Sequence, residues 1–283
     1  MSGTTISQLM QTRFAPVGRC IYCGSTSSQL GDEHIIAYGL NGNAVLPEAS
    51  CRACEKVTSQ IEKSFLRGVA WPMRARFGFQ TRRPKKIPDS FAVYVMKKGV
   101  KRKLMVPLAN YPLVLPLPIF PLPAFCEGRI VNGIEVRGVV CISLVEGIPP
   151  SEVIENARKN LGVDGLELPQ FEAFSFGRMV LKSAYALTVA EHGLNKIREP
   201  LAAPVILGHR HELGTLLGST PGVSASENAQ HITDVSLFRR GDEAIAVASV
   251  KVLGTLPAPI YVAVTARMNA EQSATKSLID AVR

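Results

Sequence analysis

The chain has 283 residues, of which 46% are apolar and 19% charged, so it can bury a substantial core as one large domain or two small ones. Five prolines interrupt its most apolar window, residues 111–125, so we expect no membrane-spanning helix and no membrane partner. The N-terminus lacks the pattern of a secretion signal and six cysteines are present, which together predict a reducing, cytoplasmic setting.

The formal net charge of +9 is unevenly distributed along the chain. The first 105 residues hold 17 Lys and Arg against 6 Asp and Glu, a net of +11, whereas the remaining 178 hold 15 against 17, a net of −2. A basic segment of this kind suits a polyanion, most simply nucleic acid. We therefore expect DNA as the partner, although charge alone does not distinguish it from RNA.

Two Cys-x-x-Cys pairs dominate the basic segment: Cys20 with Cys23, and Cys51 with Cys54. Four thiolates in two such pairs suit a closed tetrahedral zinc site, because each short loop brings two sulfurs to one ion without straining the backbone. The loop between the pairs contains Asp32-Glu33-His34, so the metal would hold a titratable imidazole and two carboxylates in place. The alternative is a purely structural zinc site with no catalytic residues beside it.

The elements expected around these cysteines follow a simple order. Apolar residues on both sides of the glycines and asparagines at 39–43 predict a strand, a turn and a second strand, and a helix is expected over about 52–68. A basic connector broken by two prolines follows, and its cations are either a solvated linker or phosphate contacts: Arg74, Arg76, Arg82, Arg83, Lys85 and Lys86.

The second half predicts strands and helices in alternation. Strands are expected over 91–96 and 104–108, a hairpin over 129–145 around Asn132-Gly133, and later strands over 244–253 and 260–264. Ser151 is expected to cap a helix that ends near Asn160, and a longer helix over 171–192 should end at Gly193. The fold class is therefore α+β. We expect two domains, residues 1–88 and residues 89–283, of which the second serves target recognition or oligomerisation, for example as a homodimer.

Phosphodiester hydrolysis near neutral pH requires an activated water, stabilised phosphate charge and an easier departure of the leaving oxygen. One histidine acting as general base beside one Mg²⁺ or similar ion meets these needs, and a carboxylate beside the histidine can bind the ion. Glu33-His34 has this form.

At this point the chain resembles the HNH endonuclease family, also called the ββα-metal fold, in its branch with a four-cysteine zinc knuckle. The resemblance covers roughly residues 17–85 and depends on CIYCG at 20–24, DEHII at 32–36, GLNGN at 39–43 and CRACE at 51–55. It implies a ββα module with a structural zinc on the four cysteines. It also implies a role for each of four site residues: His34 as general base, Glu33 and Glu55 as ligands of a catalytic Mg²⁺ or Mn²⁺, and Asn43 as the residue that orients the base.

The departure at Glu55 leaves alternatives open, whereas the departures at Ala37 and at Asn41-Gly42 are tolerable changes of turn chemistry. Ala37 stands where members often have Pro, and Glu55 stands where they usually have His or Asn, which changes the charge and ligand set of the ion. The leading hypothesis is a metal-dependent HNH-type endonuclease that cuts DNA. The alternative is a zinc-stabilised nucleic-acid-binding protein whose nuclease site has decayed, and a third, weaker one makes the C-terminal half the functional centre.

Overall fold

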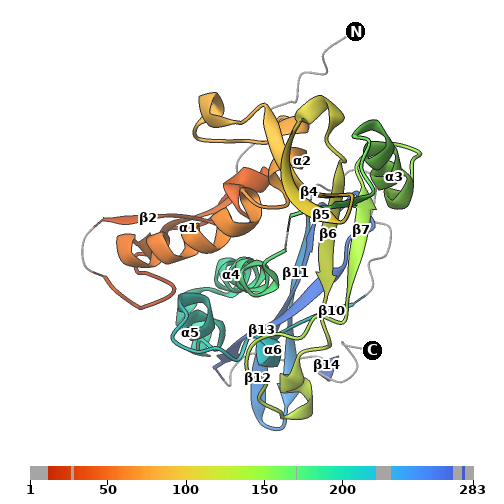
Figure 1. Ribbon diagram of the computed structural model, residues 1–283. Helices are drawn as coiled ribbons and strands as arrows, with labels where there is room; N and C mark the ends of the chain where they lie inside the picture. The colour runs from red at the N-terminus through yellow and green to blue at the C-terminus, as the bar shows by residue number, and fades with distance from the viewer. Residues whose placement is uncertain (1–11, 27–28, 170, 221–230, 270–275, 278–283) are drawn as a thin grey trace.

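The computed structural model describes residues 12–26, 29–169, 171–220, 231–269 and 276–277, and the chain has the expected α+β architecture (Figure 1). None of the helices in these ranges is both long and apolar enough to cross a bilayer.

The N-terminal segment forms a small sheet followed by a helix. Strand β3 (Ala44–Cys51) pairs antiparallel with β2 (Leu30–His34) and parallel with the short β1 (Thr12–Arg13). Helix α1 (Arg52–Leu66) begins directly after Cys51 and buries Ile61 and Phe65, four residues apart on one face. The strand, strand, helix order predicted here is therefore present.

The turn between β2 and β3 depends on glycine. It contains the 3-10 helix η1 (Tyr38–Leu40) and then Asn41 in the left-handed conformation, with φ of 62°. A Cβ atom on Gly42 would lie 1.9 Å from the carbonyl oxygen of Ile36, so any other residue would force the turn apart.

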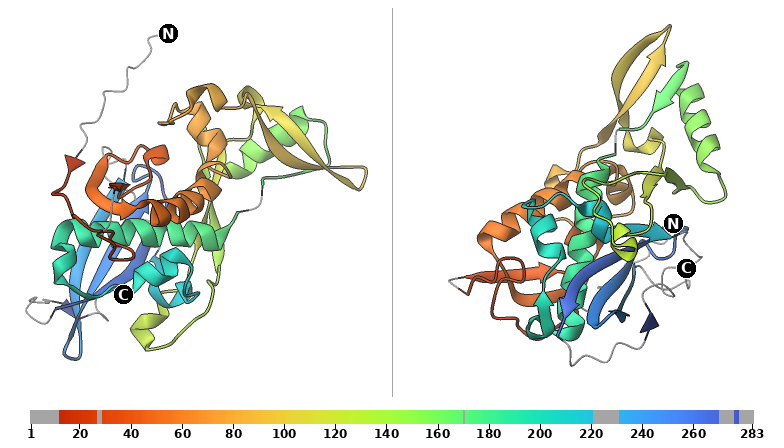
Figure 2. Two further views of the ribbon diagram at one scale, coloured as in Figure 1. Left: turned by 90° about the vertical axis from the view of Figure 1, so that its left-hand side faces the viewer. Right: turned by 90° about the horizontal axis from the view of Figure 1, so that it is seen from below.

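A middle region projects from the rest of the molecule (Figure 2). Strands β4 (Ser90–Lys97) and β5 (Val100–Pro107) form a hairpin whose two-residue turn, Lys98-Gly99, has positive φ at both positions. The short strand β8 (Gly165–Glu167) pairs with β4, and β6 (Val114–Ile119) pairs with β7 (Gly138–Ser143). The other helices and 3-10 turns of residues 67–172 are α2 (Trp71–Arg76), η2 (Pro84–Lys86), η3 (Leu108–Asn110), η4 (Ala124–Glu127) and α3 (Pro150–Asn160).

Helix α4 (Ala173–His192) is the centre of the molecule and ends at Gly193, as expected. It lies between α1 on one side and the C-terminal sheet on the other, so most of its length is buried (Figures 1 and 2). The sheet has the order β10-β13-β12-β11-β14, with β9 on β13. Its strands and the short elements around it are η5 (Leu194–Lys196), β9 (Ile197–Glu199), α5 (Ala202–Leu207), α6 (Leu213–Leu216), β10 (Leu217–Thr220), β11 (His231–Arg240), β12 (Glu243–Val252), β13 (Ile260–Met268) and β14 (Lys276–Ser277).

One hydrophobic core extends through both halves of the chain. It includes Cys20 and Phe65 of the N-terminal segment, Leu181 of α4 and Val250 of β12. The division at residue 88 stays a prediction, but the apolar surfaces on its two sides are buried against each other.

Two expectations for the second half are wrong. Residues 129–137 do not form one arm of a hairpin around Asn132-Gly133; the backbone of Gly133 instead exchanges hydrogen bonds of 2.7 Å with His211 and Gly214. The strand partner of β7 is β6, in the proline-rich window, for which the sequence indicated no element. Ser151 does not cap α3, because the helix begins one residue earlier at Pro150, and proline is well suited to the first helical position.

Candidate functional site

The four cysteines meet at one point beside the N-terminal sheet. Their Sγ atoms all lie within 4.8 Å of one another, although the two pairs are 28 residues apart in sequence. Backbone bonds shape the first pair: Gly24 N donates to Cys20 O at 2.9 Å and Ile21 N to Ala49 O at 2.8 Å. The knuckle is thereby joined to β3, which leads to the second pair.

This cluster fits a structural zinc ion. A tetrahedral zinc with Zn–S bonds of about 2.3 Å separates its sulfurs by about 3.8 Å, and the Sγ atoms of Cys23 and Cys51 lie 3.7 Å apart. Burial opposes ionisation of Cys51, but hydrogen bonds from the backbone of Cys54 and from neighbouring thiols lower its pKa to about 7. A thiolate is the form that a metal binds. The predicted metal-binding cluster is therefore present, with a donor set suited to zinc.

A β-bulge places Glu33 in the interior. The pairing of β2 with β3 shifts register between Gly31 and Glu33, so Asp32 faces solvent and forms an ion pair of 2.9 Å with Arg13, whereas Glu33 is buried. Burial raises the pKa of the Glu33 carboxyl, and Lys182 opposes that shift. A carboxylate in this position needs a cationic partner from elsewhere in the fold.

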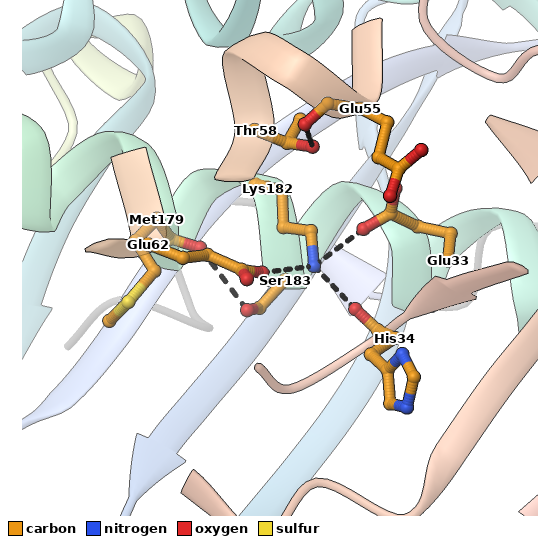
Figure 3. A network of polar contacts seen from close by, with 8 residues as sticks. All are labelled: Glu33, His34, Glu55, Thr58, Glu62, Met179, Lys182 and Ser183. Carbon is orange, nitrogen blue, oxygen red and sulfur yellow. Dashed lines mark hydrogen bonds and ion pairs between the residues drawn. The ribbon is translucent and has the colours of Figure 1, made fainter. Parts of the chain in front are cut away.

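Lys182 of α4 is that partner. Its side chain is 1% exposed, and its Nζ lies 2.6 Å from Glu33 Oε1 and 2.8 Å from Glu62 Oε1 of α1 (Figure 3). It also donates a hydrogen bond to the backbone carbonyl of His34. Burial disfavours the charged ammonium, but the two carboxylates outweigh burial and raise the pKa of Lys182. All three ammonium donors therefore have an oxygen partner.

His34 ends β2 with its ring turned away from Lys182 and its carbonyl turned towards it (Figure 3). The ring is half-buried and contacts Tyr38 edge to face, with ring centroids 5.5 Å apart. Burial first, and then the charges of Lys182 and Arg82, lower the pKa of His34. A neutral imidazole is the form that can accept a proton.

His34 lines a cleft of about 460 Å³ between α1 and the basic connector. The cleft is polar and has more cationic than acidic side chains, because six Lys and Arg line it against four Asp and Glu: Lys63, Arg67, Arg74, Arg82, Arg83 and Lys86 against Asp32, Glu33, Glu55 and Glu62. Glu55, in the first turn of α1, is exposed at this cleft. The cleft therefore combines an imidazole of lowered pKa, an accessible carboxylate and an excess of cationic side chains.

The basic connector lies beside Tyr38, which contacts the predicted base, His34. The guanidinium of Arg82 lies 6.0 Å from the centroid of the Tyr38 ring, which itself contacts His34. Arg82, Arg83 and Lys86 are exposed along the cleft, and Arg76 and Lys85 are exposed but do not line it.

Arg74 has a structural role that the sequence did not predict. Its half-buried guanidinium donates to three backbone carbonyls, Gly39 at 2.6 Å, Leu66 at 2.7 Å and Gln80 at 3.0 Å. These bonds join the turn after β2, the end of α1 and the connector. Arg74 therefore holds the shape of the cleft, and a phosphate contact by its remaining N–H donors stays a prediction.

The predicted orienting residue, Asn43, directly precedes β3, where its backbone carbonyl accepts a 2.9 Å hydrogen bond from Thr12 N. Among the described residues, those that line the cleft do not include Asn43. Its role towards His34 stays a prediction.

Sequence reasoning missed Lys182, although the sequence carries a signal for it. Lys182 is the one charged residue of 179–190, an otherwise uncharged run of the predicted 171–192 helix, and the flanking Leu181 and Ser183 are buried. A buried lysine is almost always paired, so its position predicts a carboxylate partner, but the sequence does not say which one.

Comparison with protein-family models found no match, and comparisons with curated proteins and with solved structures found none either. The HNH resemblance therefore depends on the residues and motifs themselves.

Proposed function

We propose that this protein is an HNH-type endonuclease that hydrolyses phosphodiester bonds of DNA in the cleft beside His34. The proposal is carried by one observation: His34, with its lowered pKa, lines a polar cleft in which cationic side chains outnumber acidic ones. The predicted zinc cluster supports it, because four thiolates on one ion would hold β3 and α1 in register with β2.

In the proposed reaction His34 takes a proton from a water molecule, whose oxygen attacks the phosphorus. The bond from phosphorus to the leaving oxygen breaks, and that oxygen is protonated from solvent. Exposed cations of the cleft, such as Arg67 and Arg82, would neutralise the phosphate backbone and position it.

The catalytic Mg²⁺ or Mn²⁺ implied by the resemblance fits one of its two predicted ligands. Glu55 is exposed at the cleft and would hold the ion, whereas the Glu33 carboxylate is buried against Lys182 and does not fit a ligand role. When bound, a divalent ion stabilises negative charge on the reacting phosphate.

The test is cleavage of supercoiled plasmid by the wild type and by His34→Ala with Mg²⁺, with Mn²⁺ and with a chelator of weaker affinity than the zinc site. Zinc content is measured on each protein, and His209→Ala, an exposed histidine outside the cleft, is the matched control. We expect nicking or linearisation by the wild type and His209→Ala only, at equal zinc content. Normal cleavage by His34→Ala would overturn the assignment of the base.

The second candidate is a zinc-stabilised nucleic-acid-binding protein without cleavage, and the Lys182 ammonium on Glu33 favours it. It predicts no cutting by the wild type with any of these metals, together with DNA binding that weakens steeply with salt. Replacing Arg82 or Arg83 by Ala should then reduce the slope of log K against log salt by about one for each phosphate that the variant no longer neutralises.

A further inference from the structure

The oxygens around Lys182 are of the kinds that a hard cation binds. Two carboxylates and one backbone carbonyl converge on Nζ, from Glu33, Glu62 and His34, which belong to β2 and α1 (Figure 3). Carboxylate and carbonyl oxygens are also the ligands that Mg²⁺, Mn²⁺ and Ca²⁺ prefer. The ammonium supplies one positive charge at the point where these oxygens meet.

Lys182 also leaves no room for a second cation at that point. The side chains of Lys182 and Glu33 are 1% and 6% exposed, and each of the three ammonium donors has its acceptor. A divalent ion could reach the Glu33 Oε1 atom only by displacing the ammonium into the apolar interior, which would leave a buried charge without a partner.

We propose that Lys182 is the positioning residue of the site and that its ammonium takes the place of a divalent ion at Glu33 and Glu62. Glu33 consequently binds no metal in this protein, and a fixed cation from α4 holds β2, α1 and the His34 backbone together. The inference rests on the proposed function for the role of His34, but the occupancy of Glu33 by Lys182 is independent of cleavage.

Titration of the zinc-loaded protein with Mn²⁺ tests the proposal, with free Mn²⁺ measured by its electron paramagnetic resonance signal. Lys182→Met removes the charge while keeping an unbranched side chain of similar length. We expect Glu33→Gln to bind as much Mn²⁺ as the wild type does. Lys182→Met should gain about one Mn²⁺ equivalent, because two carboxylates then face each other without a cation, and Lys182→Met with Glu33→Gln should lose that gain.

Lys251→Met is the matched control, because Lys251 is also 1% exposed but lies on β12. It should bind Mn²⁺ as the wild type does, although it too removes a buried lysine. Circular dichroism and zinc content establish that each variant is folded. Should Lys182→Met not fold, the comparison of wild type with Glu33→Gln decides alone, since Glu33→Gln keeps the Lys182–Glu62 pair.

Loss of a wild-type Mn²⁺ site in Glu33→Gln would overturn the proposal, and so would a folded Lys182→Met that gains none. Neither outcome depends on DNA cleavage. A wild type that cuts DNA and binds Mn²⁺ through Glu33 would retain the proposed function and refute this inference. A wild type that cuts no DNA but binds Mn²⁺ as expected would refute the proposed function and retain this inference.

Discussion

His34 combines accessibility with a charge environment that keeps its imidazole neutral. Burial and the cations Lys182 and Arg82 lower its pKa, while Glu62 and Asp32 act in the opposite direction without reversing the shift. A general base works in its unprotonated form, so a lowered pKa keeps that form populated at neutral pH. The cost is a weaker proton acceptor.

This environment predicts a pH dependence for cleavage. Single-turnover rates should be flat around neutrality and fall about tenfold per pH unit only below the lowered pKa of His34, under its ordinary value of 6.5. Rates measured across the acid range, with DNA binding checked at each pH, test this. A cleavage rate that already falls at pH 7 would contradict a His34 imidazole that is neutral at that pH. If the rate of His34→Ala had the same pH dependence, the fall in rate at acid pH would belong to another group.

At the scale of elements, the four-cysteine cluster brings together segments that are short or irregular. The first cysteine pair lies in irregular chain and the second spans the junction between β3 and α1. Strand β2 is only five residues long, so the register that buries Glu33 depends on neighbours being held in place. A metal bound to the four cysteines would supply that restraint.

Removing a zinc ligand should therefore disturb the site as well as the fold. Cys23→Ser, at an exposed cysteine of the cluster, should lower zinc content, reduce the melting temperature by several degrees and abolish cleavage. Cys141→Ser, at an exposed cysteine outside the cluster, is the control and should leave all three unchanged. A Cys23→Ser protein with full zinc and an unchanged melting temperature would exclude the cluster as a structural metal site.

At the scale of the whole molecule, α4 connects the cysteine segment to the C-terminal sheet. Besides the ion pairs of Lys182, Tyr185 donates from its hydroxyl to the carbonyl of Ile21 at 2.8 Å, next to the first cysteine. Ile21 and Tyr185 are both buried in the shared core. The candidate site thus belongs to an interface between distant parts of the chain.

This arrangement predicts that residues 1–88 do not fold alone. Without α4 the apolar side chains of Ile21 and Phe65 lose their buried surroundings, and each such side chain contributes about 1.5–3 kcal/mol when fully buried. With zinc present, the fragment should give a poorly dispersed amide NMR spectrum and no cooperative thermal transition. The full chain should give a well-dispersed spectrum and a cooperative transition. A well-dispersed spectrum from the fragment would show that it is an independent domain.

The sequence by itself determined the features that depend on local chemistry. Cysteine spacing predicted the metal cluster, apolar periodicity predicted α1, and the helix expected over 171–192 ends at Gly193, because these signals act over a few residues. The same reasoning failed for Asn132-Gly133, since a hairpin turn signal is overridden when the backbone finds partners as distant as His211 and Gly214.

Only the tertiary structure decided what surrounds Glu33 and His34. Sequence spacing places the two residues side by side, but Glu33 is buried at the bulge in β2 whereas His34 is only half-buried. The partner of Glu33 comes from α4, in the second half of the chain. An ion pair between residues so far apart in sequence has no local sequence signature, because the packing of α4 on α1 brings its members together. For that reason the sequence indicated a metal ligand where the fold supplies a lysine.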